Sequence, residues 1–162
     1  MPAHFQLSLE FNQAGKKFAK IKNDYYVKPL AKINESDTYP RVVPFIKKIR
    51  AKNVKVGSCS SSRNAKTVLD KLCISSLFDV VITGADVTKA KPDPEIFLLV
   101  ATKLRIPPER CLVFEDAVSG VEAANFAKMK CVGVGTPELL PNASMCISDY
   151  SKIDISAMLG AN

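Results

Sequence analysis

Between residues 44 and 147, short apolar runs alternate with stretches in which apolar residues recur every three or four positions. The apolar runs predict strands, over residues 54–58, 78–83, 111–114, 131–134 and 145–147. The amphipathic stretches predict helices, over residues 44–50, 64–72, 94–104 and 118–129. Apolar strands that alternate with helices are typical of parallel sheets covered on both faces. We therefore expect an α/β fold with a Rossmann-like parallel sheet flanked by helices.

Two of the predicted helices carry signals at their first turn. Asp93 is a candidate N-cap in front of Pro94, which suits the first helical position. Ser119 and Glu122 have the spacing of a capping box.

The chain before this pattern has a different organisation. Residues 14–33 predict one more helix, since their apolar positions approximate the 3.6-residue period, although Pro29 interrupts it. Residues 34–44 are polar and contain two prolines. They predict a linker or hinge.

Composition narrows the class of protein. With 47% hydrophobic and 24% charged residues, the 162 residues are typical of one globular domain. No apolar run is long enough to predict a membrane span. Residues 1–15 do not have the pattern of a secretory signal peptide, so we expect none. Five cysteines without a Cys-x-x-Cys pair predict reduced thiols in a cytoplasmic protein. The single histidine, His4, argues against a Ser-His-Asp triad or a histidine-ligated metal.

The formal charge of +7 is concentrated in one part of the chain. Residues 16–71 hold 15 Lys and Arg against 4 Asp and Glu, whereas residues 72–162 hold 8 against 11. Such a surface suits nucleic acid or anionic small molecules. Because few aromatic residues interrupt the basic stretch, we favour solvated helix surfaces with some phosphate-binding groups and expect no nucleic-acid partner.

Polar residues follow three of the predicted strands, where ligands of parallel sheets bind. A serine-rich stretch over residues 58–64 enters a helix and could bind phosphate or merely cap that helix. Lys91 lies in a rigid proline-rich turn, and could reach a phosphate or simply lie at the surface. Glu115 and Asp116 could bind Mg²⁺ through oxygen atoms or favour the next helix start. Together, a hydroxyl, an ammonium and two carboxylates suit phosphoryl transfer.

Three ordered motifs resemble those of the haloacid-dehalogenase superfamily. They read VGSCSSSRN over residues 56–64, KPDPEIF over 91–97 and VFEDAVSGVEAA over 113–124. The stretch KNDYYVK over residues 22–28 is similar to the last cap helix of the β-phosphoglucomutases. The resemblance implies a haloacid-dehalogenase-type core over residues 37–162 and the remnant of a helical cap over residues 1–36.

The resemblance also implies a chemistry: Mg²⁺-dependent interconversion of β-glucose 1-phosphate and glucose 6-phosphate, or hydrolysis of a related sugar phosphate. It implies that Lys91 neutralises the transferring phosphoryl group and that Glu115 and Asp116 hold Mg²⁺, directly or through water. The residues implied to contact the phosphosugar are Lys22, Asn23, Ser60, Ser61, Asn64 and Lys91.

The family's first motif, which begins Asp-x-Asp, has no counterpart in the sequence. The resemblance implies that its aspartates supply the phosphoryl-accepting nucleophile and lie on a central strand. We therefore expect an incomplete sheet with unpaired edges, and no turnover by this chain alone. Two interpretations remain: the chain represents part of an enzyme, or it is a non-catalytic phosphosugar-binding or regulatory remnant that docks on a full-length homologue. In either case another chain could supply the missing segment.

Overall fold

A computed structural model of the chain describes residues 32–38, 41–150 and 153–154. The chain divides into two compact units, Met1–Ile33 and Asn34–Asn162, and all the elements below belong to the second. Lys22, Asn23 and nearly all of the helix predicted over residues 14–33 lie outside the described residues. The division into a cap remnant over residues 1–36 and a core over 37–162 stays a prediction.

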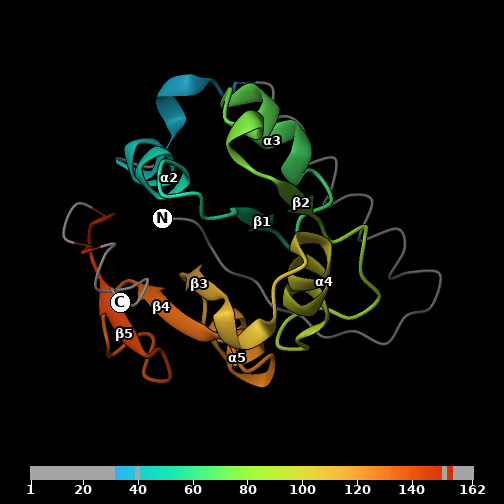
Figure 1. Cartoon of the computed structure of the whole chain (residues 1–162), viewed down its shortest axis with the longest axis vertical. Coiled ribbons are helices and arrows are strands. Elements are labelled where there is room, and N and C mark those ends of the chain that lie inside the picture. Colours follow the sequence, from blue (N-terminus) through green and yellow to red (C-terminus); the bar gives the residue numbers. More distant parts are fainter. Residues whose placement is uncertain (1–31, 39–40, 151–152, 155–162) are drawn as a thin grey trace. The chain divides into compact units, whose positions relative to one another are not determined.

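The second unit alternates helices and strands, as the sequence pattern predicts (Figure 1). Its elements in chain order are η1 (Glu35–Asp37), α2 (Val42–Arg50), β1 (Gly57–Cys59), α3 (Ala65–Lys71), η2 (Ser75–Leu77), β2 (Val80–Ile82), α4 (Glu95–Leu104), η3 (Pro108–Arg110), β3 (Leu112–Glu115), α5 (Val118–Phe126), β4 (Lys130–Val134) and β5 (Met145–Ile147).

The strands of the described residues form two parallel sheets, one ordered β1-β2 and the other β3-β4-β5. Ser58 pairs with Val81 in the first sheet, and Val113 pairs with Cys131 in the second. Within the residues that the structure describes, β1 pairs only with β2 and β3 only with β4. Both therefore keep one unpaired edge, so the expectation of an incomplete parallel sheet flanked by helices is confirmed.

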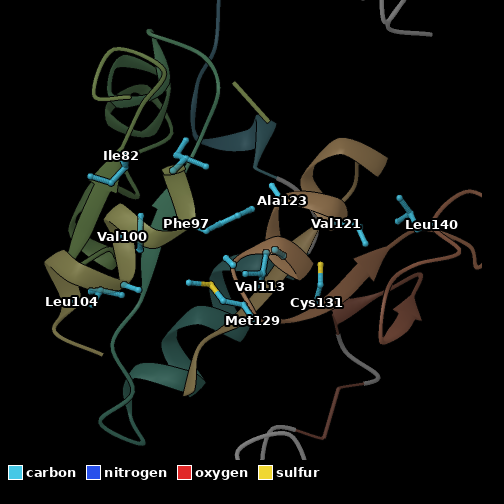
Figure 2. Packing of buried hydrophobic residues seen from close by; sticks show 14 residues of the cluster. Ile82, Phe97, Val100, Leu104, Val113, Val121, Ala123, Met129, Cys131 and Leu140 are labelled. Carbon is cyan, nitrogen blue, oxygen red and sulfur yellow. The ribbon is translucent and has the colours of Figure 1, made fainter. Parts of the chain in front are cut away.

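One hydrophobic cluster joins the two sheets (Figure 2). Ile82 of β2, Phe97 and Val100 of α4, Val113 of β3 and Val121 of α5 all belong to it, and each is at most 8% exposed. Full burial of such side chains stabilises the fold by about 1.5–3 kcal/mol each. This packing fixes β1 and β2 relative to β3 without a hydrogen-bonded ladder between them.

Aromatic residues cover the other face of β3. Successive side chains of a strand point to opposite faces, so Phe114 faces away from the cluster that contains Val113. The Phe114 ring lies 5.3 Å from that of Phe45 in α2 and 6.0 Å from that of Tyr150. Both faces of β3 are thus covered.

Helix α5 differs from its sequence prediction at both ends. The capping box of Ser119 and Glu122 is wrong, because α5 begins at Val118 and its N-cap is Ala117, without a side-chain cap. Ser119 is therefore already inside the first turn. Helix α5 also ends at Phe126 instead of residue 129, since Lys128 adopts a left-handed conformation (φ 60°) that stops the helix.

The start of α4 is shifted by one residue from its prediction. Pro94 occupies the N-cap position instead of the first helical position. Asp93 still caps the helix, because its carboxylate accepts a hydrogen bond of 3.0 Å from the N–H of Glu95.

The first two strands are shorter than predicted. The prediction over residues 54–58 becomes Gly57–Cys59, and that over residues 78–83 becomes Val80–Ile82. Just before β1, the Asp79 N–H still donates to the Val56 carbonyl at 2.7 Å, but the Val56 N–H donates to the Asp79 carboxylate, also at 2.7 Å, instead of to a backbone carbonyl.

In the described part of the chain, no helix has the length and apolar character that crossing a membrane requires.

Candidate functional site

The loop that leaves β1, residues 60–64 (the serine loop), is organised by its own hydroxyl groups. The N–H of Ser60 donates to the Ile82 carbonyl at 3.0 Å, which ties the loop to the end of β2. The N–H of Ser62 donates to Ser60 Oγ at 3.2 Å, and the N–H of Asn64 donates to Ser62 Oγ at 3.2 Å. Ser60 Oγ accepts this hydrogen bond through a lone pair, and its hydroxyl proton is a separate donor that can bind an anion.

The loop that carries Lys91 is held by a carboxylate from the following helix. Glu95 accepts hydrogen bonds from the N–H groups of Thr88 and Lys89, at 3.0 and 2.7 Å, and from the Thr88 hydroxyl. These backbone hydrogen bonds, made to the charged form, lower the pKa of Glu95. The Lys91–Pro92 peptide bond that follows is cis.

Lys91 and Glu115 form a short ion pair at the centre of the candidate site. Lys91 Nζ lies 2.6 Å from Glu115 Oε2, and the two side chains are 10% and 12% exposed. The ammonium also lies 4.6 Å from the centre of the Phe97 ring, which adds a cation–π contact. Lys91, which follows β2, and Glu115, the last residue of β3, are thus direct partners, although they are far apart in the sequence.

The thiol of Cys59, the last residue of β1, is affected by the charges of this pair. Burial raises the pKa of Cys59 to about 12, with Lys91 opposing the shift and Glu115 adding to it. Cys59 is followed directly by Ser60, the first residue of the serine loop. That Ser60 and the pair bind one common ligand stays a prediction.

The Glu115 carboxyl group occupies space that is open because Gly120 has no side chain. A Cβ atom on Gly120, in the first turn of α5, would lie only 2.1 Å from the Glu115 carboxyl carbon. Neither this role of Gly120 nor the anchoring role of Glu95 is among the expectations from the sequence. Both residues lie inside the resembling motifs, but the pattern of residue types does not show which contacts they make.

Asp116 and Glu115, the two candidate metal ligands, differ in exposure and in the contacts that their carboxylates make. Asp116 is exposed, whereas the Glu115 carboxylate is engaged by Lys91. Among the residues described, no group of three or more His, Cys, Asp or Glu side chains could hold a metal ion. Mg²⁺ typically uses only one or two carboxylates, with water and phosphate oxygens as its other ligands. Asp116 fits that role, and Glu115 keeps its second carboxylate oxygen, Oε1, for it while Oε2 contacts Lys91.

Comparison with known proteins identifies the family. A family described as haloacid dehalogenase-like hydrolase matches residues 4–128 of the chain. The chain belongs to the haloacid dehalogenase-like hydrolases. The resemblance of its three motifs to that superfamily is thereby confirmed.

Two relatives of this haloacid dehalogenase-like chain have names that refer to phosphorylated sugars. β-Phosphoglucomutase of Bacillus subtilis (strain 168) is 32% identical over 137 residues, which cover 85% of the chain and 61% of that protein. The phosphorylated carbohydrates phosphatase of Thermotoga maritima is 41% identical over 90 residues, 54% of the chain and 42% of that protein. The chain therefore spans about three fifths of the first relative and less than half of the second.

The fold of this haloacid dehalogenase-like chain is also found in a solved β-phosphoglucomutase. The crystal structure of the Clostridium difficile protein matches with a TM-score of 0.84 and 34% identity, covering 91% of the chain and 67% of that protein. The α/β fold with its flanking helices is thus that of the family. The individual roles of the site residues stay predictions.

Proposed function

We propose that this chain carries the phosphate-binding part of a Mg²⁺-dependent phosphosugar phosphotransferase. Its reaction would be the interconversion of β-glucose 1-phosphate and glucose 6-phosphate, or the hydrolysis of a related sugar phosphate. The similarity to a β-phosphoglucomutase and to a phosphorylated carbohydrates phosphatase supports this substrate class. The observation that carries the proposal is the buried Lys91–Glu115 pair, whose charges act on Cys59, the residue directly before the serine loop.

In this proposal the serine loop and Lys91 bind the transferring phosphoryl group. The Ser60 hydroxyl and the Ser61 N–H donate hydrogen bonds to its oxygens, with Asn64 nearby. Lys91 neutralises charge that develops on the same group. Phosphoryl transfer depends mainly on positioning and on electrostatic stabilisation, which preorganised donors supply without reorganisation.

The metal and the sugar would be bound by other groups. Asp116 would hold Mg²⁺, and Glu115 would join it directly or through water. Bound Mg²⁺ would neutralise part of the phosphate charge. Lys22 and Asn23, which lie outside the described residues, would contact the sugar phosphate.

The chemistry needs a nucleophile that these residues do not include. The sequence has no Asp-x-Asp motif, and the described residues include no histidine that could activate Ser60. We therefore expect binding without turnover from this chain alone.

The free thiols of all five cysteines favour the cytoplasm as its location.

Binding of glucose 6-phosphate to the purified chain in the presence of Mg²⁺, measured by titration calorimetry, tests the proposal. Lys91→Met should weaken binding roughly tenfold or more, because a hydrogen bond to a charged group contributes about 1.5–3 kcal/mol. Lys89→Met is the matched control, since Lys89 lies in the same loop but is 68% exposed and pairs with Asp93. Equal affinities for both variants and the unaltered chain would refute the proposed site.

A coupled assay on the same protein tests the second part of the proposal. With β-glucose 1-phosphate and Mg²⁺ we expect no formation of glucose 6-phosphate. Turnover at a rate that depends on enzyme concentration would show that the chain contains its own nucleophile.

A second candidate function is supported by the unpaired edges of β1 and β3. Such edges offer backbone hydrogen bonds to another strand. The chain could therefore act as a non-catalytic phosphosugar-binding remnant that docks on a full-length homologue. Size-exclusion chromatography of the chain mixed with a complete family member from the same cell tests it: co-elution supports docking, and separate elution contradicts it.

A further inference from the structure

Gly84, which follows β2 by two residues, lies against the backbone of the serine loop. A Cβ atom at this position would lie 2.1 Å from the carbonyl oxygen of Ser61 and 2.9 Å from its carbonyl carbon. Both are backbone atoms, so no flexible side chain could swing aside to make room. The loop therefore occupies the space that any other residue would fill at position 84.

The Ser61 carbonyl is connected to the Ser60 hydroxyl through a single peptide group. In a trans peptide the C=O and the N–H point in opposite directions. With the Ser61 oxygen turned toward Gly84, the N–H of Ser62 points the other way and donates to Ser60 Oγ at 3.2 Å. Rotation of this peptide would remove that hydrogen bond and bring a carbonyl oxygen toward the anion.

The strand end that holds Gly84 has little freedom to move away. The neighbouring Thr83 is 3% exposed, and its N–H and hydroxyl both donate to Asp86 Oδ2 at 2.8 Å. On its other side, Ile82 accepts the hydrogen bond of 3.0 Å from the Ser60 N–H. A side chain at position 84 would therefore displace the serine loop in preference to the strand end.

We infer that Gly84 is a positioning residue, which fixes the orientation of the Ser61–Ser62 peptide and through it the anion-binding geometry of Ser60. This inference rests on the proposed phosphate site. It assigns to Gly84 no contact with the substrate.

Gly57 of β1 provides the matched control. A Cβ atom on Gly57 would lie 2.6 Å from Val100 Cγ1, a side-chain atom in the hydrophobic cluster. Gly57 is the first residue of β1, at the opposite end of the strand from the serine loop. Gly57→Ala should therefore disturb packing without turning the Ser61–Ser62 peptide. A general loss of stability and a specific loss of positioning can thus be separated.

The experiment titrates the full chain, labelled with ¹⁵N, with inorganic phosphate and follows amide chemical shifts. Gly84→Ala should weaken phosphate binding roughly tenfold or more, the contribution expected for one charge-assisted hydrogen bond. Gly57→Ala should lower the thermal midpoint, but the folded protein should bind phosphate within about twofold of the unaltered chain. Circular dichroism reports whether each variant is folded.

Unchanged phosphate affinity in folded Gly84→Ala would overturn the inference while leaving the proposed function intact. Absence of phosphate binding by the unaltered chain would overturn both. If Gly84→Ala does not fold, the phosphate titration of the unaltered chain still tests whether Gly84 and the serine loop are coupled. The Gly84 amide should then shift together with those of Ser60 and Ser61 as phosphate binds, and a Gly84 signal that stays in place would refute the coupling.

Discussion

Replacement of Lys91 by Met would leave the Glu115 carboxylate, which is 12% exposed, without its cation. Breaking a buried pair from one side typically destabilises a protein by about 3–5 kcal/mol, because the remaining charge is left uncompensated. Glu115→Gln keeps the shape and one hydrogen-bond acceptor but removes the charge, so we expect a loss of about 1.5–3 kcal/mol. The double variant has no unpaired charge at this site. Its loss in free energy of unfolding should therefore be smaller than the sum of the two single losses, by at least about 2 kcal/mol.

Urea unfolding followed by far-UV circular dichroism measures these free energies of unfolding, since the chain has no tryptophan to report by fluorescence. Lys89→Met is the control, because Lys89 pairs with Asp93 at 3.3 Å but is 68% exposed. Its removal should change the free energy of unfolding by less than about 1 kcal/mol. If the losses from Lys91→Met and Glu115→Gln are additive within about 0.5 kcal/mol, the two side chains do not interact and the description of the site is wrong.

Other features of the site lead to further predictions. Gly120→Ala should destabilise the chain by about 1–3 kcal/mol in the same urea assay, since its Cβ would overlap the Glu115 carboxyl group; an unchanged midpoint would contradict this. Hydrogen bonding lowers the pKa of Glu95 below its usual 4.5, so its contribution to stability is complete above that pH and is lost as the pH falls through the lower folded-state value. Glu95→Gln should therefore flatten the fall in stability below about pH 4.5, and an unaltered pH profile would exclude the effect. Burial raises the pKa of Cys59 to about 12, so iodoacetamide at neutral pH should label exposed Cys73 well before Cys59. Peptide mass spectrometry showing equal labelling would contradict this burial.

The arrangement of strands and helices was largely predictable from the sequence, because it depends on periodicity. Continuous apolar runs such as residues 131–134 have few alternatives to a buried parallel strand, and β4 forms there. Helix α4 was equally well marked, since prolines limit its start and apolar residues recur along it. The ends of elements were less predictable. The lengths of β1 and β2 depend on contacts with residues distant in the sequence, such as that between Val56 and Asp79.

The site was predictable as a set of residue types but not as a set of contacts. Lys91 and Glu115 could be selected because each follows a strand, and parallel strands end at the same edge of a sheet. Their mutual ion pair depends on side-chain conformations and on the space at Gly120, which no residue pattern encodes. The same is true of Gly84, which matters because a Cβ atom at this position would overlap the Ser61 carbonyl group. Such close approaches are visible only in three dimensions.

A crystal structure of the chain with inorganic phosphate and Mg²⁺ is the decisive test of the proposed phosphate site. We expect one phosphate ion with oxygens within hydrogen-bonding distance of both Ser60 Oγ and Lys91 Nζ. A phosphate ion bound elsewhere, with the Ser60 hydroxyl and the Lys91 ammonium directed to separate surfaces, would contradict it.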